Sequence, residues 1–181
     1  MIRDFFVDNF EHVLAALIFI AWAGDNISTR LVTPTMKLEA NPLAKRFPRI
    51  ITWFGLLVCA LPYFSTPLAV MVVAPWLLVV AANFGQGWTA RVLGEAETLE
   101  LFKRAVARGS LRSALAMTAA HAAFLALAGF LLIFLSEGPR SWGYWFALGL
   151  LLYAFGKALH TTIFYVRAFR SRTLGASTES A

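Results

Sequence analysis

Polar side chains interrupt the strongly apolar segments of this chain or stand directly at their ends. They include carboxylates, amides and imidazoles, the groups that bind metal ions, move protons or hold ligands. Ionisable and strongly polar groups are costly in an apolar environment, so each marks a possible functional site. The candidates are Asp25, Thr29, Glu39, Asn41, Asn83, Gln86, His121 and His160.

The apolar segments around these residues predict helices that cross a lipid bilayer. Hydrophobic residues make up 59% of the 181 residues and charged residues only 14%, against roughly 25% charged residues in soluble domains. A spanning helix needs about 20 mostly apolar residues. We therefore expect an all-α, polytopic transmembrane helix bundle with five spans, at about 5–31, 42–64, 68–88, 113–135 and 142–169.

The segment at about 95–108 differs from these spans because it is charged. Its apolar residues Leu99, Phe102 and Val106 recur at steps of three and four, as on one face of a helix, and Glu100 can pair with Arg104 one turn on. This pattern predicts an amphipathic helix on the cytoplasmic surface of the membrane. Residues 1–170 then form one membrane domain, and the polar residues 171–181 a disordered tail.

Basic residues lie mainly between spans one and two, between spans three and four, and after span five. Such residues collect on the cytoplasmic side, so we expect an inner-membrane protein with its N-terminus outside and its C-terminus in the cytoplasm. The net charge of +6 then predicts contact with the bilayer and with anionic lipids at the inner face, and no nucleic acid.

Counted along the spans, the candidate residues lie near one level, at the cytoplasmic edge of the membrane. One interpretation is structural: Asp25 bonds Asn83 or a histidine and holds the helices in register. A second is a site for a divalent metal (zinc, iron or manganese) formed by His121, His160, Asp25 and Glu39. A third is a proton or cation relay, and a fourth is a pocket for a small ligand or lipid headgroup.

Part of the sequence follows a recognisable pattern. Asp25 and Thr29 end the first predicted span, and Glu39, Asn41 and Pro42 open the second. This resembles a D-x-x-x-T … E-x-N-P signature found in a family of small, uncharacterised, multi-spanning bacterial membrane proteins. The family's glycine-rich link is replaced here by Thr33-Pro34-Thr35. The resemblance implies a site at these positions without assigning a chemistry to it.

Together these features predict a small inner-membrane protein with a polar pocket open to the cytoplasm. It would bind a ligand or metal, or serve as an accessory subunit beside a protein partner or a second copy. Two alternatives remain open at this point, a membrane-embedded metal-dependent enzyme and a proton- or cation-coupled transporter or channel. A chain of this length without internal repeats would need to oligomerise to form a transport path.

Overall fold

The computed structural model of the protein describes residues 8–35, 38 and 45–178, and in these residues it is helical and contains no strand. The all-α fold class is therefore confirmed. In chain order the elements are α2 (Phe10–Val32), α4 (Pro48–Val58), the 3-10 turn η1 (Leu61–Tyr63), α5 (Thr66–Leu93), α6 (Glu95–Arg108), α7 (Leu111–Leu135) and α8 (Trp142–Thr178).

Four of these helices are long and apolar enough to cross a membrane. They are α2, α5, α7 and the part of α8 from Trp142 to Arg170. Each covers one of the predicted spans, with ends that differ by a few residues. The chain thus has the helices of a membrane protein.

The second predicted span, 42–64, has a different form. Its apolar helix α4 has 11 residues, and the chain then enters the turn η1. Pro62 explains the break, because a proline has no N–H to donate to the Val58 carbonyl four residues earlier. Residues 39–44, where this span was expected to begin, lie outside the described residues.

The other difference lies at the C-terminus. Helix α8 continues to Thr178, so residues 171–178 are helical and not the disordered tail expected from their polar composition. Once a helix has formed, each further residue adds one hydrogen bond at small cost, and this segment contains no proline. Residues 179–181 lie outside the description.

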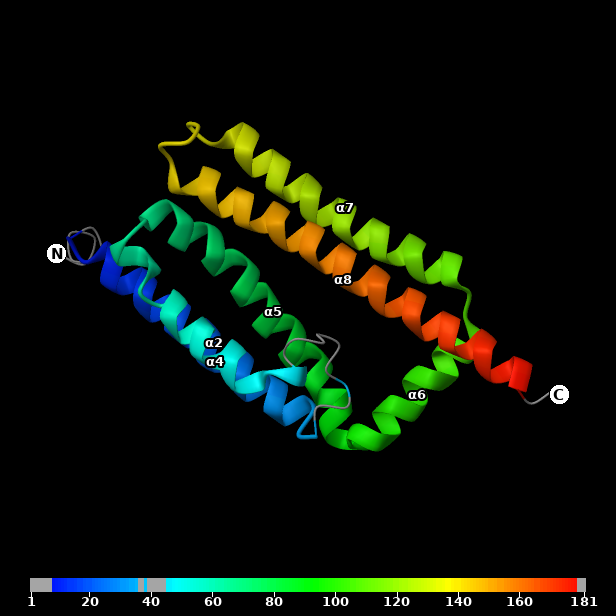
Figure 1. Ribbon diagram of the computed structural model, residues 1–181. Helices are drawn as coiled ribbons and strands as arrows, with labels where there is room; N and C mark the ends of the chain where they lie inside the picture. The colour runs from blue at the N-terminus through cyan, green and yellow to red at the C-terminus, as the bar shows by residue number, and fades with distance from the viewer. Residues whose placement is uncertain (1–7, 36–37, 39–44, 179–181) are drawn as a thin grey trace.

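The long helices lie side by side in a row (Figure 1). α7 packs on α8, α8 on α5 and α5 on α2, while α4 packs on α2. Helix α6 connects α5 to α7 at one end of the row and covers the range predicted for the surface helix. On it Glu100 pairs with Lys103, whose Nζ lies 2.6 Å from the carboxylate, and not with Arg104 as expected from spacing.

α2 and α5 run in the same direction. Leu14 and Ile18, in the first half of α2, pack on Ala69, Val70 and Val73 in the first half of α5. Near the other end, a Cβ on Gly87 would lie 3.0 Å from Val32. The chain must therefore return along the whole length of α2 before α5 begins.

α4 and η1 make part of this return, running antiparallel to α2. The hydroxyl of Tyr63 lies 2.8 Å from Nδ1 of His12, at the start of α2. Further along, Nε1 of Trp22 donates to the carbonyl of Thr52 at 3.0 Å. The start of α2 thus contacts η1, and a later residue of α2 contacts an earlier residue, in α4. This order shows that α4 carries the chain back toward the start of α2.

Glycines allow α8 to approach both of its neighbours closely. A Cβ on the buried Gly149 would lie 2.1 Å from the carbonyl oxygen of Met71 on α5. A Cβ on the buried Gly129 of α7 would lie 2.8 Å from the side chain of Leu151. Small residues at such contacts let helix backbones approach within a membrane.

We predict that Gly149→Ala destabilises the protein, because the new methyl group would overlap backbone that cannot move independently of α5. Overpacking of this kind costs about 1–3 kcal/mol. Gly156→Ala, seven residues further along α8, is the matched control because its Cβ would meet nothing within 4 Å. Thermal unfolding of the detergent-purified variants should show a lower midpoint for the first variant only, and equal midpoints would refute the close contact of α5 and α8.

Candidate functional site

Asp25 and Asn83 join α2 to α5. Nδ2 of Asn83 donates to Oδ1 of Asp25 at 2.9 Å, and both side chains are half-buried. One turn after Asp25, the fully buried Ser28 donates its hydroxyl to the Asp25 carbonyl at 3.1 Å. The interhelical hydrogen bond expected for Asp25 is therefore present.

A second set of polar contacts joins α2 to α4. Asn26 donates through Nδ2 to the carbonyl of Trp22 at 2.8 Å and accepts the hydroxyl of Thr52 at 3.1 Å. Gly55 makes room for this contact, because a Cβ there would lie 2.7 Å from the indole of Trp22. The side chains of Trp22 and Asn26 thus bind the short helix α4 to this side of α2, both through Thr52.

A third cluster ties the end of α2 to the start of α6. The hydroxyl of the buried Thr33 donates to one carboxylate oxygen of Glu95. The amide and the hydroxyl of Thr35 donate to the other oxygen, at 3.1 Å and 2.6 Å. The Thr33-Pro34-Thr35 segment that replaces a glycine-rich link therefore has a role of its own, which is to bind the first residue of α6.

On the other side of α5, a groove with a volume of about 520 Å³ lies between α6, α7 and α8. Aromatic side chains form part of its wall, and Phe102 of α6 lies with its ring centroid 4.9 Å from that of Phe164. Its polar lining consists of hydroxyls, one imidazole and one ammonium group. These polar residues are Ser110, Ser113, Thr118, His121, Lys157, Thr161 and Tyr165.

Lys157 is the basic residue of this groove, and it lies close to the middle of the candidate span Trp142–Arg170. Its Nζ donates to the hydroxyl of Tyr153 at 3.2 Å and lies 5.5 Å from the centre of the Tyr153 ring. In the part of the chain that the structure describes, no carboxylate pairs with it. A lysine at mid-membrane costs about 3 kcal/mol on insertion scales, so such a residue needs a reason to be there.

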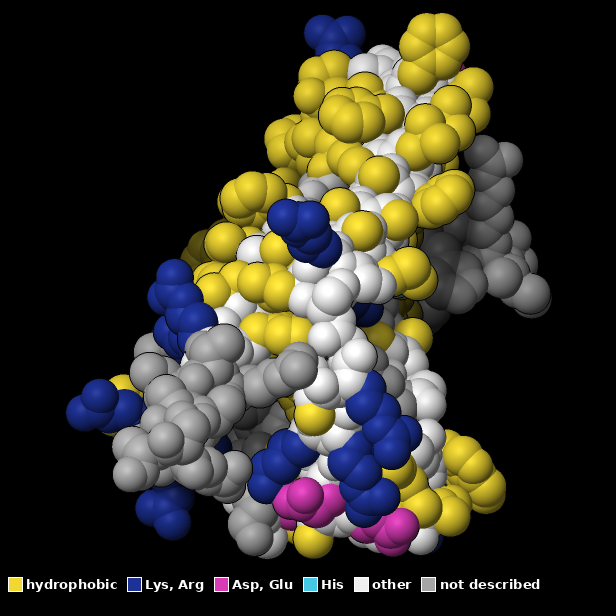
Figure 2. All heavy atoms as spheres, turned by 90° about the vertical axis from the view of Figure 1, so that its right-hand side faces the viewer, with side chains coloured by type: hydrophobic (Ala, Val, Ile, Leu, Met, Phe, Trp, Pro, Cys, Tyr) yellow, Lys and Arg dark blue, Asp and Glu magenta, His cyan; other side chains and the backbone are white. Residues whose placement is uncertain are grey.

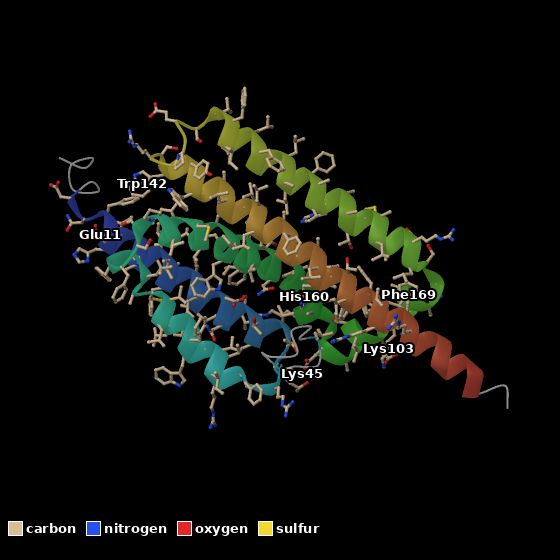
Figure 3. All side chains as sticks on the ribbon, turned by 45° about the horizontal axis from the view of Figure 1, so that its top comes forward. Glu11, Lys45, Lys103, Trp142, His160 and Phe169 are labelled. Carbon is tan, nitrogen blue, oxygen red and sulfur yellow. The ribbon has the colours of Figure 1, made fainter. Side chains whose placement is uncertain are left out.

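The register of α7 against α8 places His121 level with Lys157. A Cβ on Gly129 of α7 would touch Leu151 and the Ala147 carbonyl, so their antiparallel pairing brings position 121 opposite position 157. His160 is adjacent in sequence to the groove residue Thr161 and hence about 100° around the helix from it. It is exposed on α8 (Figure 3) and does not line the groove, so the structure does not bring the two histidines together there.

The other predicted site residues are spread over the molecule. Thr29 is half-buried on α2, and Gln86 lies on α5 with a side chain that is not described. Glu39, Asn41 and Pro42 lie outside the described residues. Of the predicted metal ligands, Asp25 is on α2 and the histidines are on α7 and α8. No three His, Cys, Asp or Glu side chains among the described residues are grouped so as to hold a metal ion.

The sequence alone did not point to Lys157 or Glu95, although both side chains make clear contacts in the structure. Lys157 could have been identified from the sequence, because it is a charged residue inside an apolar span. Glu95 was harder to identify from the sequence, since acidic residues are common in the first turn of a helix. Its contacts with Thr33 and Thr35 join positions about 60 residues apart, which spacing alone does not reveal.

Comparison with known proteins adds no relative: the sequence matches no protein-family model, no curated protein and no solved structure. The resemblance to the family with the D-x-x-x-T … E-x-N-P signature therefore stays a prediction.

We predict that Asp25 and Asn83 are energetically coupled. In a double-mutant cycle of Asp25→Ala and Asn83→Ala, the coupling should be about 0.6 kcal/mol and at most about 1.7 kcal/mol, the range found for hydrogen bonds between membrane helices. The measurement is the free energy of unfolding in mixed micelles titrated with a denaturing detergent. The control cycle pairs Asn83→Ala with Asn26→Ala, because Asn26 is the neighbour of Asp25 but bonds toward α4. The control should be additive, and additivity in both cycles would contradict the bond.

Proposed function

We propose that the protein is a five-pass protein of the bacterial inner membrane that binds an amphiphilic ligand in the groove between α6, α7 and α8. In this proposal the N-terminus is outside, the C-terminus is in the cytoplasm, and the groove belongs to the inner half of the bilayer. The observation that carries the proposal is the polar lining of an open groove between the apolar helices α7 and α8 and the charged helix α6.

The direction of the helices supports five crossings. α2 and α5 are parallel, so if both cross the membrane, the chain between them must cross back. With its turn η1, α4 is the element available for this return. Its 11 residues would reach about 16 Å at 1.5 Å per residue, so α4 covers part of the crossing.

The distribution of charge supports the orientation. The end of the molecule that carries α6 and the C-terminal part of α8 faces the viewer in Figure 2, and basic side chains are spread over it. The ends of α2 and α5 and the start of α7 lie at this same end (Figure 1), and they carry Arg30, Arg91 and Arg112. The loop between α7 and α8, at the opposite end, has Arg140 alone as a basic residue. Basic residues mark the cytoplasmic side of such proteins.

The size and lining of the groove suit a ligand with both polar and apolar parts. A volume of about 520 Å³ is within the range of roughly 300–1,000 Å³ that is usual for ligand sites. Hydroxyls from α7 and α8 face it together with Phe102, Val106 and Phe169. A wholly apolar lipid tail would offer no polar partner to Lys157, and a small hydrophilic ligand would leave the aromatic wall without contacts.

The groove is also open to its surroundings along α7. Met117 lines it, yet 72% of the surface of this residue is exposed. Large side chains on the rest of α7 are exposed as well, such as Phe124 at 75% and Phe134 at 85%. In a membrane these side chains would face lipid, so a ligand could enter the groove sideways from the bilayer.

The predicted enzyme and transporter have no comparable observation in their favour among the described residues. The polar cluster on the other side of α5 is occupied by contacts between helices, from Asp25 to Asn83 and from Asn26 to Thr52. These contacts support a structural role for that cluster. The binding role belongs to the groove.

We predict that filling the groove abolishes ligand retention. The variant is Ala114→Phe, because Ala114 is half-buried and lines the groove from α7. Ala116→Phe is the matched control: it puts the same side chain on an exposed position of the same helix that does not line the groove. The probe is bilayer phospholipid, counted by native mass spectrometry after purification from nanodiscs of mixed phosphatidylcholine and phosphatidylglycerol.

Wild type and Ala116→Phe should each keep a tightly bound lipid, and Ala114→Phe should lose it. Equal retention in all three proteins, or no retained lipid in the wild type, would refute the groove as a lipid-accessible binding site. The thermal midpoint of each variant, measured in parallel, shows that the protein is folded.

A further inference from the structure

We infer that the ligand is an anionic amphiphile whose negatively charged group is bound by the ammonium of Lys157. This inference rests on the proposed function, since it names the chemical class of the molecule that the groove takes. It depends on three features of the groove: a cation with no counter-ion among the described residues, a polar lining, and an apolar wall.

The ammonium of Lys157 has hydrogen-bonding capacity left over. It carries three N–H donors, and Tyr153 accepts one of them at 3.2 Å. Tyr153 lies one turn earlier on α8 and is not part of the groove lining, whereas Lys157 is. The remaining donors are thus available to a molecule that enters the groove.

Among the described residues, no acidic side chain lines the groove beside Lys157. Asp25 is bonded to Asn83 and belongs to α2. α2 and α8 lie on opposite sides of α5 (Figure 1). Pairing stabilises a charge in an apolar setting. No carboxylate among the described residues pairs with Lys157, so an anionic ligand would supply that partner.

The neighbouring polar groups also suit an anion. Thr161 follows Lys157 by one helical turn on the same face of α8, and His121 is level with Lys157 on α7. Hydroxyls and imidazoles can donate to the oxygens of a phosphate or carboxylate. Ser110 and Ser113 continue the polar lining toward the α6–α7 turn, which gives an anionic group a polar route from the inner surface.

The apolar wall indicates that the anion is attached to a hydrocarbon chain. Phe102 and Tyr165 are stacked with ring centroids 6.3 Å apart, and Phe169 is 3.8 Å from the Cβ position of Gly109. An acyl chain would cover these rings, and inorganic phosphate would not. We therefore assign the site to a phosphate- or carboxylate-bearing lipid.

The test is the headgroup preference of the retained lipid. Protein is purified from nanodiscs with equal amounts of phosphatidylglycerol and phosphatidylcholine, which share acyl chains and differ in net charge. The wild type should retain phosphatidylglycerol with about a fivefold preference, the factor expected for one added cation near anionic lipid. Lys157→Gln should lose this preference and still retain lipid, which shows that its groove is intact, whereas Lys157→Arg should keep the preference.

Lys45→Gln removes the same charge from an exposed position near the start of α4 and is the matched control, so it should behave like the wild type. A wild type that retains lipid without preference, or a Lys157→Gln variant that keeps the preference, would overturn the anion assignment while leaving the groove as a lipid site. If excess inorganic phosphate removed the preference, the ligand would be a free anion, and the assignment to a lipid would be wrong.

Discussion

The parallel packing of α2 against α5 is the constraint on which the rest of the structure depends. Two consecutive long helices that run in the same direction need a return segment of comparable length between them, and α4 with η1 forms part of that segment against α2. The same packing brings Asp25 level with Asn83, and brings the basic ends of α2 and α5 to the end of the molecule where α6 lies. In a bilayer, where backbone and polar groups find no water, such a register is fixed by the pairing of polar side chains as well as by packing.

α5 divides the molecule into two parts with different polar chemistry. On the side of α2 and α4, the side chains of Asp25, Asn26 and Thr52 are joined to one another or to neighbouring helices. On the side of α6, α7 and α8, the hydroxyls and Lys157 face an open groove. The first arrangement stabilises helix contacts. The second includes the ammonium of Lys157, for which Tyr153 is the acceptor among the described residues. This contrast is the basis for proposing the groove as the binding site.

Much of the fold could be predicted because hydropathy along the chain reports directly on helices that face lipid. It predicted the four long helices, and the three- and four-residue steps of apolar residues predicted a helix at the position of α6. The bond between Asp25 and Asn83 was one of the interpretations that polarity within the spans offered. The sequence did not predict that the second span would contain a short helix, α4, followed by the turn η1. The effect of Pro62 on a short apolar run depends on local hydrogen bonding. The groove was not predicted, because the relative rotation and register of α7 and α8 decide which residues meet. His121 is level with Lys157, whereas the metal interpretation had grouped His121 with His160.

The most direct test of this account is the side of the membrane on which each end of α4 lies, because that decides whether the groove belongs to the inner half of the bilayer. In a Cys59→Ser background, single cysteines at Phe64, after η1, and at Lys45, before α4, are labelled with a membrane-impermeant maleimide; both positions are exposed. The account predicts that the cysteine at Phe64 is labelled from outside intact cytoplasmic membranes, and that the one at Lys45 is labelled only after permeabilisation. Labelling of both from the same side would contradict the return crossing and, with it, the position assigned to the groove.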